Sequence, residues 1–493
     1  MKKNIHIIGS GFSSIAAACY LAQQGCQVTI LEKNDGIGGR ASVYKKDGFT
    51  FDMGPTWYWM PDIFERFFAD FGKQPSDYYH LERLAPAYQV YFDKMDSLLV
   101  SDQLEAIYDM FEQEEPGSAK HLRSFLKTAQ GNYDVALSAL VYQPGISPFE
   151  LVNWDTITRL NQVLTTIKDE VRAKIVSLKL IKILEFPVLF LGAKPSKTPG
   201  LYSFMNWADF GLGTWHPKGG MYEVVKGMAD LADSLGVVFK TNIEVQKINV
   251  GSDRSVSSLS TNQGVFEVDI LLSGADYHHT ESLLDVGFRQ YSESYWNKRT
   301  FAPSSLLFYI GLDKKLEHVS HHTLFFDTDF DRHAYAIYDE PAWPEKPLFY
   351  ASFPSITDEG FAPSGKEAAT ILIPLAPGLE DTEEMRTFYF EEIMNRLETL
   401  TGQEVRSQVL FAESFCVNDF KDRYHSYKGN AYGLANTLTQ TAFLRPKIKS
   451  KKVKNLFFTG QLTVPGPGVP PALISGKIAA NQILKQLAHE KYF

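Results

Sequence analysis

Short apolar runs separated by small residues dominate the first 35 positions of the chain. An apolar run at 5–8 and another at 28–31 have the length of strands, and the small residues between them predict a helix that begins near Ser13. Two glycines, Gly9 and Gly11, stand between the first run and this helix. The pattern therefore predicts a strand, a tight glycine turn, a helix and a second strand, which together form a βαβ unit.

The glycine turn has the residues that a dinucleotide site needs. Gly9 allows the chain to turn sharply, and Gly11 leaves the backbone open to a pyrophosphate, which the amides at the helix N-terminus would bind. Glu32 follows about 20 residues later, where an acid meets the ribose hydroxyls. Ser14 replaces the third glycine of the motif and is small enough for close packing of helix and strand. The expected cofactor contacts in this unit are Gly9, Gly11, Phe12, Ser13, Ser14, Glu32 and Lys33.

Further glycine segments favour a flavin over a nicotinamide cofactor. Gly38 and Gly39 precede Arg40, so that open backbone and a positive charge both come close to the second phosphate. The segment Gly54-Pro55-Thr56 follows at a short interval. An NAD-binding unit and a buried βαβ unit without a ligand remain the alternatives. We expect cofactor contacts from Gly38, Gly39, Arg40, Gly54, Pro55 and Thr56.

The rest of the chain predicts that the nucleotide domain is discontinuous. Residues 103–185 favour helices, and an apolar run at 455–460 has the pattern of a further parallel strand, followed by a helix at 471–487. The expected fold class is α/β, with a Rossmann-type domain into which a mixed α+β substrate domain is inserted. The expected segments are 1–100, 215–280 and 426–493 for the nucleotide domain, 101–214 for a helical part that meets substrate and membrane, and 281–425 for the substrate sheet.

Composition and charge narrow the range of partners. The chain of 493 residues has a formal net charge of −9, which argues against nucleic acid. Three cysteines without a C-x-x-C spacing indicate a reducing cytosol. The glycine turn interrupts the apolar N-terminus, so we expect no signal peptide, and no window of about 18 uncharged apolar residues predicts a membrane span. The histidines lack a metal-binding spacing, and no metal is expected.

Taken together, these motifs resemble those of the carotenoid desaturase family, and most of all the bacterial phytoene desaturase type. The resemblance runs from end to end of the chain, and its most specific part is the loop 465–470 before the last helix. Pro467 departs from the pattern of the family, as Ser14 does. The resembling segments are 9–40, 48–61, 217–221 and 458–477.

The resemblance implies an amine-oxidase-like flavoprotein architecture, with FAD as the cofactor and a C40 polyene lipid as the substrate. It also implies peripheral attachment to a membrane surface from the cytoplasm, because such a substrate dissolves only in lipid. The helix after the terminal loop would direct its N-terminal dipole at a reduced, negatively charged flavin. The further cofactor residues that the resemblance implies are Val245, which would meet the adenine through its backbone, and Gly460, Gly468, Val469 and Pro470.

The implied reaction introduces double bonds into phytoene, towards neurosporene or lycopene, by hydride transfer to the flavin and loss of a neighbouring proton. Oxygen or a quinone would then take the electrons, and the sequence does not identify the catalytic base. Alternatives within the family are a hydroxycarotenoid 3,4-desaturase, a diapophytoene desaturase and a carotenoid isomerase. An amine oxidase and a non-catalytic protein that binds flavin or polyene are alternatives of other kinds.

Three segments are candidates for contact with the substrate or with lipid. The aromatic triplet 57–59 would line a polyene tunnel, although core packing is the commoner role of such residues. The apolar run 186–192, with lysines nearby, would enter a bilayer surface or form a buried helix end. The basic run 445–454 would contact lipid headgroups or form a solvated loop.

Overall fold

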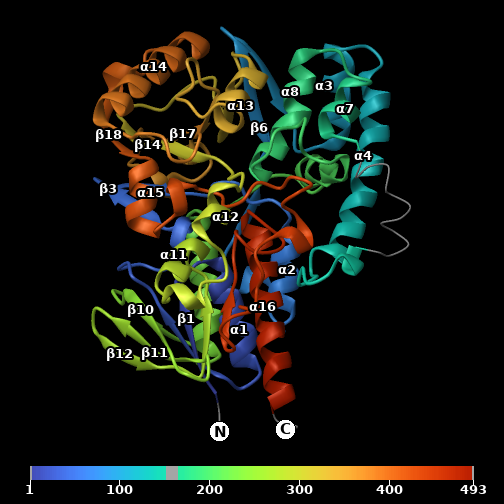
Figure 1. The fold of residues 1–493 in the computed structure, drawn as a ribbon. Helices are drawn as coiled ribbons and strands as arrows, with labels where there is room; N and C mark the ends of the chain where they lie inside the picture. Colours follow the sequence, from blue (N-terminus) through green and yellow to red (C-terminus); the bar gives the residue numbers. More distant parts are fainter. Residues whose placement is uncertain (1–2, 152–164, 491–493) are drawn as a thin grey trace.

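A parallel sheet of five strands forms the lower half of the molecule, in a computed structural model that describes residues 3–151 and 165–490 (Figure 1). Its strands are β1 (Asn4–Ile8), β2 (Gln27–Leu31), β9 (Val238–Lys240), β13 (Ile270–Ser273) and β19 (Leu456–Phe458). Their order is β19-β13-β1-β2-β9, and all neighbours run parallel. Three distant parts of the chain therefore build one sheet, which confirms the predicted discontinuous α/β fold.

Two helices pack closely against each other beside this sheet: α1 (Phe12–Gln23) and α16 (Val469–Glu490). The buried side of α1 consists largely of small residues, including Ala16 and Ala17. A Cβ atom on Gly476 of α16 would lie 2.4 Å from the carbonyl oxygen of Ser13 and 2.9 Å from the Ala16 Cβ. The two helix backbones are therefore nearly in contact, which only a glycine at this position permits.

A mixed sheet of seven strands forms the upper part of the molecule (Figure 1). Its strands are β6 (Tyr88–Asp93), β7 (Asp96–Val100), β14 (Ser304–Leu312), β15 (His322–Phe325), β16 (Phe349–Ser352), β17 (Glu367–Leu375) and β18 (Val409–Phe415). The order is β18-β14-β17-β16-β15-β6-β7, and side chains of α14 (Glu383–Thr401) share its buried core. β6 and β7 form a hairpin, which pairs with this sheet and not with the nucleotide sheet. The division into five segments stays a proposal, and these strands fit its substrate sheet better than its first segment.

A layer of helices stands on the other side of the molecule from the β14 and β17 strands (Figure 1). It contains α3 (Leu104–Glu114), α4 (Ser118–Val135), α7 (Ile167–Arg172) and α8 (Leu178–Glu185), where the sequence predicts helices; residues 152–164 lie outside the described part.

The remaining elements complete the fold. α10 (Met221–Ser234) packs on α1, and β10 (Val245–Val250), β11 (Val256–Thr261) and β12 (Gly264–Glu267) form a small antiparallel sheet. The shorter elements are β3 (Val43–Lys46), β4 (Phe49–Asp52), α2 (Pro61–Ala69), β5 (Leu81–Arg83), α9 (Phe204–Asn206), β8 (Trp215–Pro217), α11 (Tyr277–Ser282), α12 (Glu293–Asn297), α13 (Phe330–Tyr338) and α15 (Val417–Tyr424).

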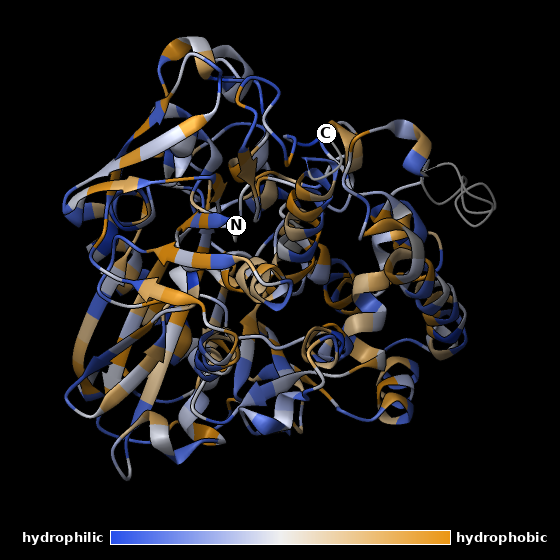
Figure 2. Ribbon diagram, turned by 90° about the horizontal axis from the view of Figure 1, so that it is seen from below, coloured by the Kyte–Doolittle hydropathy of each residue, from blue (hydrophilic) through white to orange (hydrophobic). Residues whose placement is uncertain are grey.

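The distribution of apolar residues follows these layers. Much of each sheet is orange, the colour of apolar residues, in Figure 2. Within residues 3–151 and 165–490, no helix combines the length and the apolar character that crossing a bilayer requires. The three cysteines carry free thiols.

The contact between α1 and α16 can be tested with Gly476→Ala. The added methyl group would overlap the Ser13 carbonyl oxygen, so we expect the helices to move apart at a cost of about 1–3 kcal/mol. A lower melting temperature in calorimetry would report this cost. Gly36→Ala is the matched control, because no described heavy atom lies within 4 Å of its Cβ position. Equal melting temperatures of the two variants would contradict the close packing.

Candidate functional site

One cavity of about 620 Å³ lies between the parallel sheet, the seven-stranded sheet and the helical layer. Its lining changes character from one end to the other. Glycines and polar groups from β1, β2 and α1 line one end, whereas aromatic and aliphatic side chains line the other. The cavity therefore suits a ligand that is polar at one end and apolar at the other.

The glycine turn forms the floor of the polar end. Gly9 has a left-handed backbone (φ 83°), and its N–H donates to the Leu31 carbonyl at 2.8 Å, so that the turn lies directly on β2. Gly11 begins α1, and a Cβ atom there would meet no described heavy atom within 4 Å. The space that Gly11 leaves empty belongs to the cavity. The first amides of α1 face it, as an anion site at a helix N-terminus requires.

The Glu32 carboxylate is fixed at the same end by four hydrogen bonds. Its Oε2 accepts from the Ser10 N–H at 2.9 Å and from the Ser10 hydroxyl at 2.7 Å. Its Oε1 accepts from the N–H and the side-chain amide of Asn34, both at 2.9 Å. The carboxylate is buried but still lines the cavity, beside Lys33 and Val245. These four hydrogen bonds already occupy its roughly four lone-pair sites, so a ribose hydroxyl would replace one of the side-chain donors, Ser10 or Asn34.

Arg40 places a buried positive charge in the cavity. Its Nη2 donates to the Ser426 hydroxyl at 2.5 Å, and its guanidinium lies 5.2 Å from the ring centroid of Tyr424. Burial lowers the pKa of Arg40, and the nearby Asp276 carboxylate opposes that shift. Its Nε is buried without a hydrogen-bond partner among residues 3–151 and 165–490. A buried guanidinium with an unused donor is suited to an anion such as a pyrophosphate.

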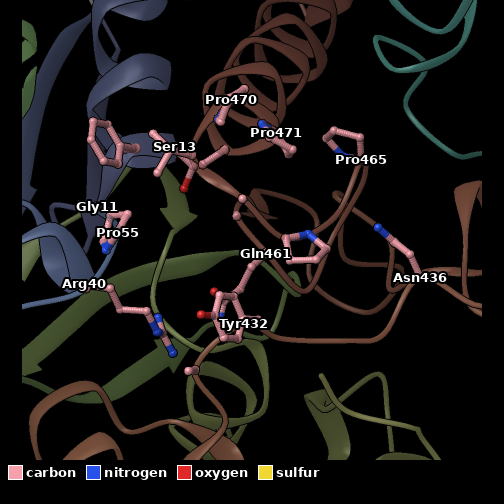
Figure 3. A pocket seen from close by; sticks show the side chains of 18 of the residues that line it. Gly11, Ser13, Arg40, Pro55, Tyr432, Asn436, Gln461, Pro465, Pro470 and Pro471 are labelled. Carbon is pink, nitrogen blue, oxygen red and sulfur yellow. The ribbon is translucent and has the colours of Figure 1, made fainter. Parts of the chain in front are cut away.

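The start of α16 contributes to the cavity in a different way from the start of α1. Figure 3 shows Pro470 and Pro471 near Ser13, with Arg40 lower in the view, towards Tyr432. The two prolines have no N–H, so α16 offers a helix dipole and an apolar surface rather than a row of donors. The α1 end therefore fits the pyrophosphate of a dinucleotide, and the α16 end fits an aromatic ring system that gains negative charge on reduction.

The segment of Gly54, Pro55 and Thr56 forms a wall between the two ends. A Cβ atom on Gly54 would lie 2.2 Å from the Arg40 carbonyl oxygen, so the two backbones are in direct contact. The Thr56 hydroxyl lies 2.8 Å from that of Tyr350 on β16. Beyond this wall, the apolar end includes Trp57, Phe186, Phe204, Leu324, Phe326 and Phe330.

The cavity brings together nearly all of the cofactor residues that the sequence predicts. The following line it: Gly9, Gly11, Phe12, Ser13, Glu32, Lys33, Gly38, Gly39, Arg40, Gly54, Pro55, Thr56, Val245, Gly460, Gly468, Val469 and Pro470. Ser14 does not line it. A Cβ atom on Gly274, at the end of β13, would lie 2.0 Å from the Ser14 hydroxyl oxygen. The serine thus occupies space that Gly274 leaves free, which explains how this chain dispenses with the third glycine of the motif.

Sequence reasoning missed the residues that the segment 420–443 contributes to the cavity. Arg423, Tyr424 and His425 follow one another at the end of α15, and Tyr432 and Asn436 come from the loop after it. Gly429 and Gly433 lie in this segment, but no periodic pattern or nucleotide motif accompanies them. The pairing of β18 with β14 and contacts such as that of Arg40 with Ser426 place the segment over the cofactor end, and all of these are long-range contacts.

The structure describes parts of two segments for which the sequence leaves lipid contact open, and Phe186 and Val188 fit the alternative of a buried helix end. Phe186 and Val188 are buried, and Lys182 donates to the carbonyl oxygens of Phe326 and Thr328, so this part of the run 186–192 packs inside the protein. The side chains of 189–191 lie outside the described part. In the basic run, Arg445 is buried and donates to the Leu434 carbonyl at 2.9 Å, so it is a structural residue.

Comparison with known proteins identifies the class of cofactor and enzyme. The family of flavin containing amine oxidoreductases matches residues 13–484. A carotenoid 3,4-desaturase of Haloarcula japonica is 40% identical over 490 residues, 99% of each chain. A 4,4'-diapophytoene desaturase of Staphylococcus aureus is 32% identical and aligns with 98% of this chain and 99% of its own. The chain belongs to the carotenoid desaturases of the flavin-containing amine oxidoreductase family.

Solved structures agree with the fold of this family. An oxidoreductase from Methanosarcina mazei has a TM-score of 0.63 at 14% identity, covering 98% of this chain and 100% of that one. Wild-type putrescine oxidase bound to putrescine has a TM-score of 0.61 at 12% identity, covering 98% and 99%. The predicted amine-oxidase-like architecture is confirmed. The protein is a flavin-dependent oxidoreductase with FAD as its cofactor, and we propose the lining residues named above as its FAD contacts.

Gly11→Val tests the proposed position of FAD. The backbone of Gly11 is extended (φ −70°, ψ 170°), and its Cβ position is open, so valine fits the protein but fills the cavity. We expect a folded protein that purifies with less than about a tenth of the wild-type FAD content, read from its visible flavin absorbance. Gly287→Val, at another open position that does not line the cavity, is expected to retain FAD. Full occupancy in Gly11→Val would show that the cofactor lies elsewhere.

Proposed function

We propose that this enzyme introduces carbon–carbon double bonds into a carotenoid. The observation that supports this most directly is the continuity of the cavity, which joins a positively charged nucleotide end to a long apolar wall. The names of the two curated relatives point to the same class of substrate. A polyene has no charge and almost no hydrogen-bonding groups, so apolar contact along its length is what a binding site can offer it.

The protein has three tasks in such a reaction. When bound, FAD supplies the two-electron oxidant that takes a hydride from an allylic C–H bond. The aromatic residues, among them Trp57 and Phe186, hold the chain in line and exclude water from a cationic intermediate. Arg40 and the N-terminus of α1 hold the diphosphate. We further propose that oxygen or a quinone reoxidises the cofactor.

Phytoene is the substrate that the sequence favours, and one structural observation supports a hydroxylated carotenoid instead. The Tyr338 hydroxyl, at the end of α13, is buried at the cavity with no hydrogen-bond partner in the described part of the chain. Such an unpaired hydroxyl costs about 1–3 kcal/mol, which a hydroxyl group on the substrate would offset. The relative at 40% identity is named a carotenoid 3,4-desaturase.

Product spectra with two substrates test both candidates. The purified enzyme is incubated with phytoene and with a monohydroxylated carotenoid, and each new conjugated double bond moves the absorption to longer wavelength. If Tyr338 binds a substrate hydroxyl, Tyr338→Phe lowers kcat/KM for the hydroxylated substrate by about tenfold or more and leaves that for phytoene unchanged. Tyr335→Phe, on the exposed side of the same helix, is the control. No spectral change with either substrate would refute the proposed function.

The mouth of the cavity is the proposed site of contact with a membrane. Lys447 Nζ donates to the carbonyls of Gly145 and Phe443, so the segments 145–150 and 438–444 lie together, and both line the cavity. They also carry exposed apolar side chains, with Phe149 80% and Ile146 63% exposed. An apolar rim around the opening would let a lipid-soluble substrate enter without crossing water.

Vesicle flotation with the double variant Ile146→Ser/Phe149→Ser tests this mouth. Each side chain that enters lipid contributes about 1.5–3 kcal/mol, so we expect binding to phospholipid vesicles to fall at least about tenfold. Val286→Ser is the matched control, because Val286 is 75% exposed and does not line the cavity. Equal loss of vesicle binding in the control would mean that the exposed side chains at the mouth are not the site of membrane contact.

A further inference from the structure

Behind the aromatic wall of the cavity, Tyr350 and His322 form a hydrogen-bonded pair. The Tyr350 hydroxyl lies 2.7 Å from His322 Nδ1 and 2.8 Å from the Thr56 hydroxyl. Tyr350 and Thr56 line the cavity, whereas His322 is fully buried behind them. The pair stands on the adjacent strands β16 and β15, which are antiparallel and in register over four residue pairs. The sheet therefore holds Tyr350 and His322 in a fixed geometry, and Thr56 joins them from the segment after β4.

A desaturase needs a proton acceptor at the apolar end of such a cavity, and this requirement rests on the function proposed above. The lining carboxylates lie elsewhere: Glu32, Glu244 and Asp276 are at the nucleotide end, and Glu150 is at the mouth. His333 faces the apolar end, but its Nδ1 accepts from the Leu348 N–H at 2.9 Å and its Nε2 donates to the Pro374 carbonyl at 2.9 Å. Tyr350 differs from the other lining tyrosines in the described part of the chain, because an imidazole stands directly behind its hydroxyl.

We propose that Tyr350 accepts the proton that the substrate loses and passes its own hydroxyl proton to His322 Nδ1. The hydride carries two electrons from one substrate carbon to the bound flavin. The C–H bond on the neighbouring carbon breaks, its electron pair becomes the new π bond, and its proton binds to the Tyr350 oxygen. The original O–H bond of Tyr350 breaks as that proton moves to His322. The phenol remains neutral, and the imidazole becomes an imidazolium.

The surroundings of His322 suit this role. Its ring stacks on the Trp57 ring, with centroids 4.1 Å apart and planes at 9°, so an imidazolium would lie against an aromatic face. Burial holds the pKa of His322 well below its ordinary value, so that the ring is neutral and able to accept before each turnover. Burial also raises the pKa of Tyr350, which keeps the phenol protonated. If the Thr56 hydroxyl donates to Tyr350, the Tyr350 proton is directed at His322.

His321 and Thr357 stand between His322 and the surface. The His321 ring lies 4.5 Å from the His322 ring, and its Nδ1 is 2.6 Å from the Thr357 hydroxyl. Thr357 is exposed at the surface. One proton is released for every double bond formed, and because His322 Nε2 has no hydrogen-bond partner in the described part of the chain, no continuous hydrogen-bonded path leads this proton out of the cavity.

Steady-state turnover of the holoenzyme with a carotenoid, read from the absorbance of the conjugated product, tests the relay. Tyr350→Phe keeps the ring but removes the hydroxyl, so we expect kcat to fall about a hundredfold or more, with KM and FAD content within about twofold of wild type. Tyr91→Phe is the matched control, because this buried tyrosine on β6 also donates one hydrogen bond, to the His318 carbonyl, but does not line the cavity. A wild-type rate in Tyr350→Phe overturns the relay alone, whereas a wild-type enzyme that no carotenoid reduces refutes the proposed function as well.

A second measurement does not depend on turnover. In holoenzyme labelled with ¹⁵N-histidine, His322→Gln assigns the His322 signals by their loss. The relay requires a neutral ring with its proton on Nε2 and an Nδ1 signal that moves in Tyr350→Phe. A proton on Nδ1 would overturn the proposal, because that nitrogen could not then accept. If Tyr350 only supported the fold, Tyr350→Phe would move the Nδ1 signal and leave the catalytic rate unchanged.

Discussion

The close packing of α16 on α1 is the contact on which the cofactor end of the cavity depends. Gly476 brings the two backbones together over the Ser13 carbonyl, and the small side chains of α1 leave room for the approach. Because the helices then begin side by side, one space receives the free amides of α1 and the dipole of α16. Arg40 adds a full charge to the same space. Such a concentration of positive charge in a buried region is stable when an anion occupies it, and the diphosphate of FAD is such an anion.

The same geometry separates the cavity into two chemical environments. Pro470 and Pro471 end the row of donors at the start of α16, and Trp57 begins the aromatic wall only one residue after Thr56. We propose that FAD binds along this line, with its charged part among amides and its ring system at the border with apolar side chains. Hydride transfer between ring and hydrocarbon would then take place at this boundary, away from water and next to Thr56 and Tyr350.

The sequence predicts the parts of this arrangement that depend on local backbone geometry. Gly9, Gly11 and Gly54 are needed because the chain turns or approaches another backbone there, and a glycine at such a place is visible in the sequence. Tyr350, His322 and Arg423 have no such signal, since only the pairing of strands far apart in the chain makes them neighbours. Analogy with the motif predicts a cofactor contact for Ser14, but its environment is set by Gly274, a residue that the motif does not include.

Three of the buried polar atoms without a partner lie at the cavity, where function accounts for their cost in stability. The Arg40 Nε, the Tyr338 hydroxyl and the His322 Nε2 all lie in or directly behind the cavity wall and have no partner in the described part of the chain. A folded protein usually pairs such groups, because each unpaired one costs about 1–3 kcal/mol. Around a binding cavity the cost is conditional, since a bound anion can pair the Arg40 Nε and a substrate hydroxyl can pair the Tyr338 hydroxyl. Apolar side chains at these positions would make the protein without its ligands more stable, but they would lose the contacts with cofactor and substrate.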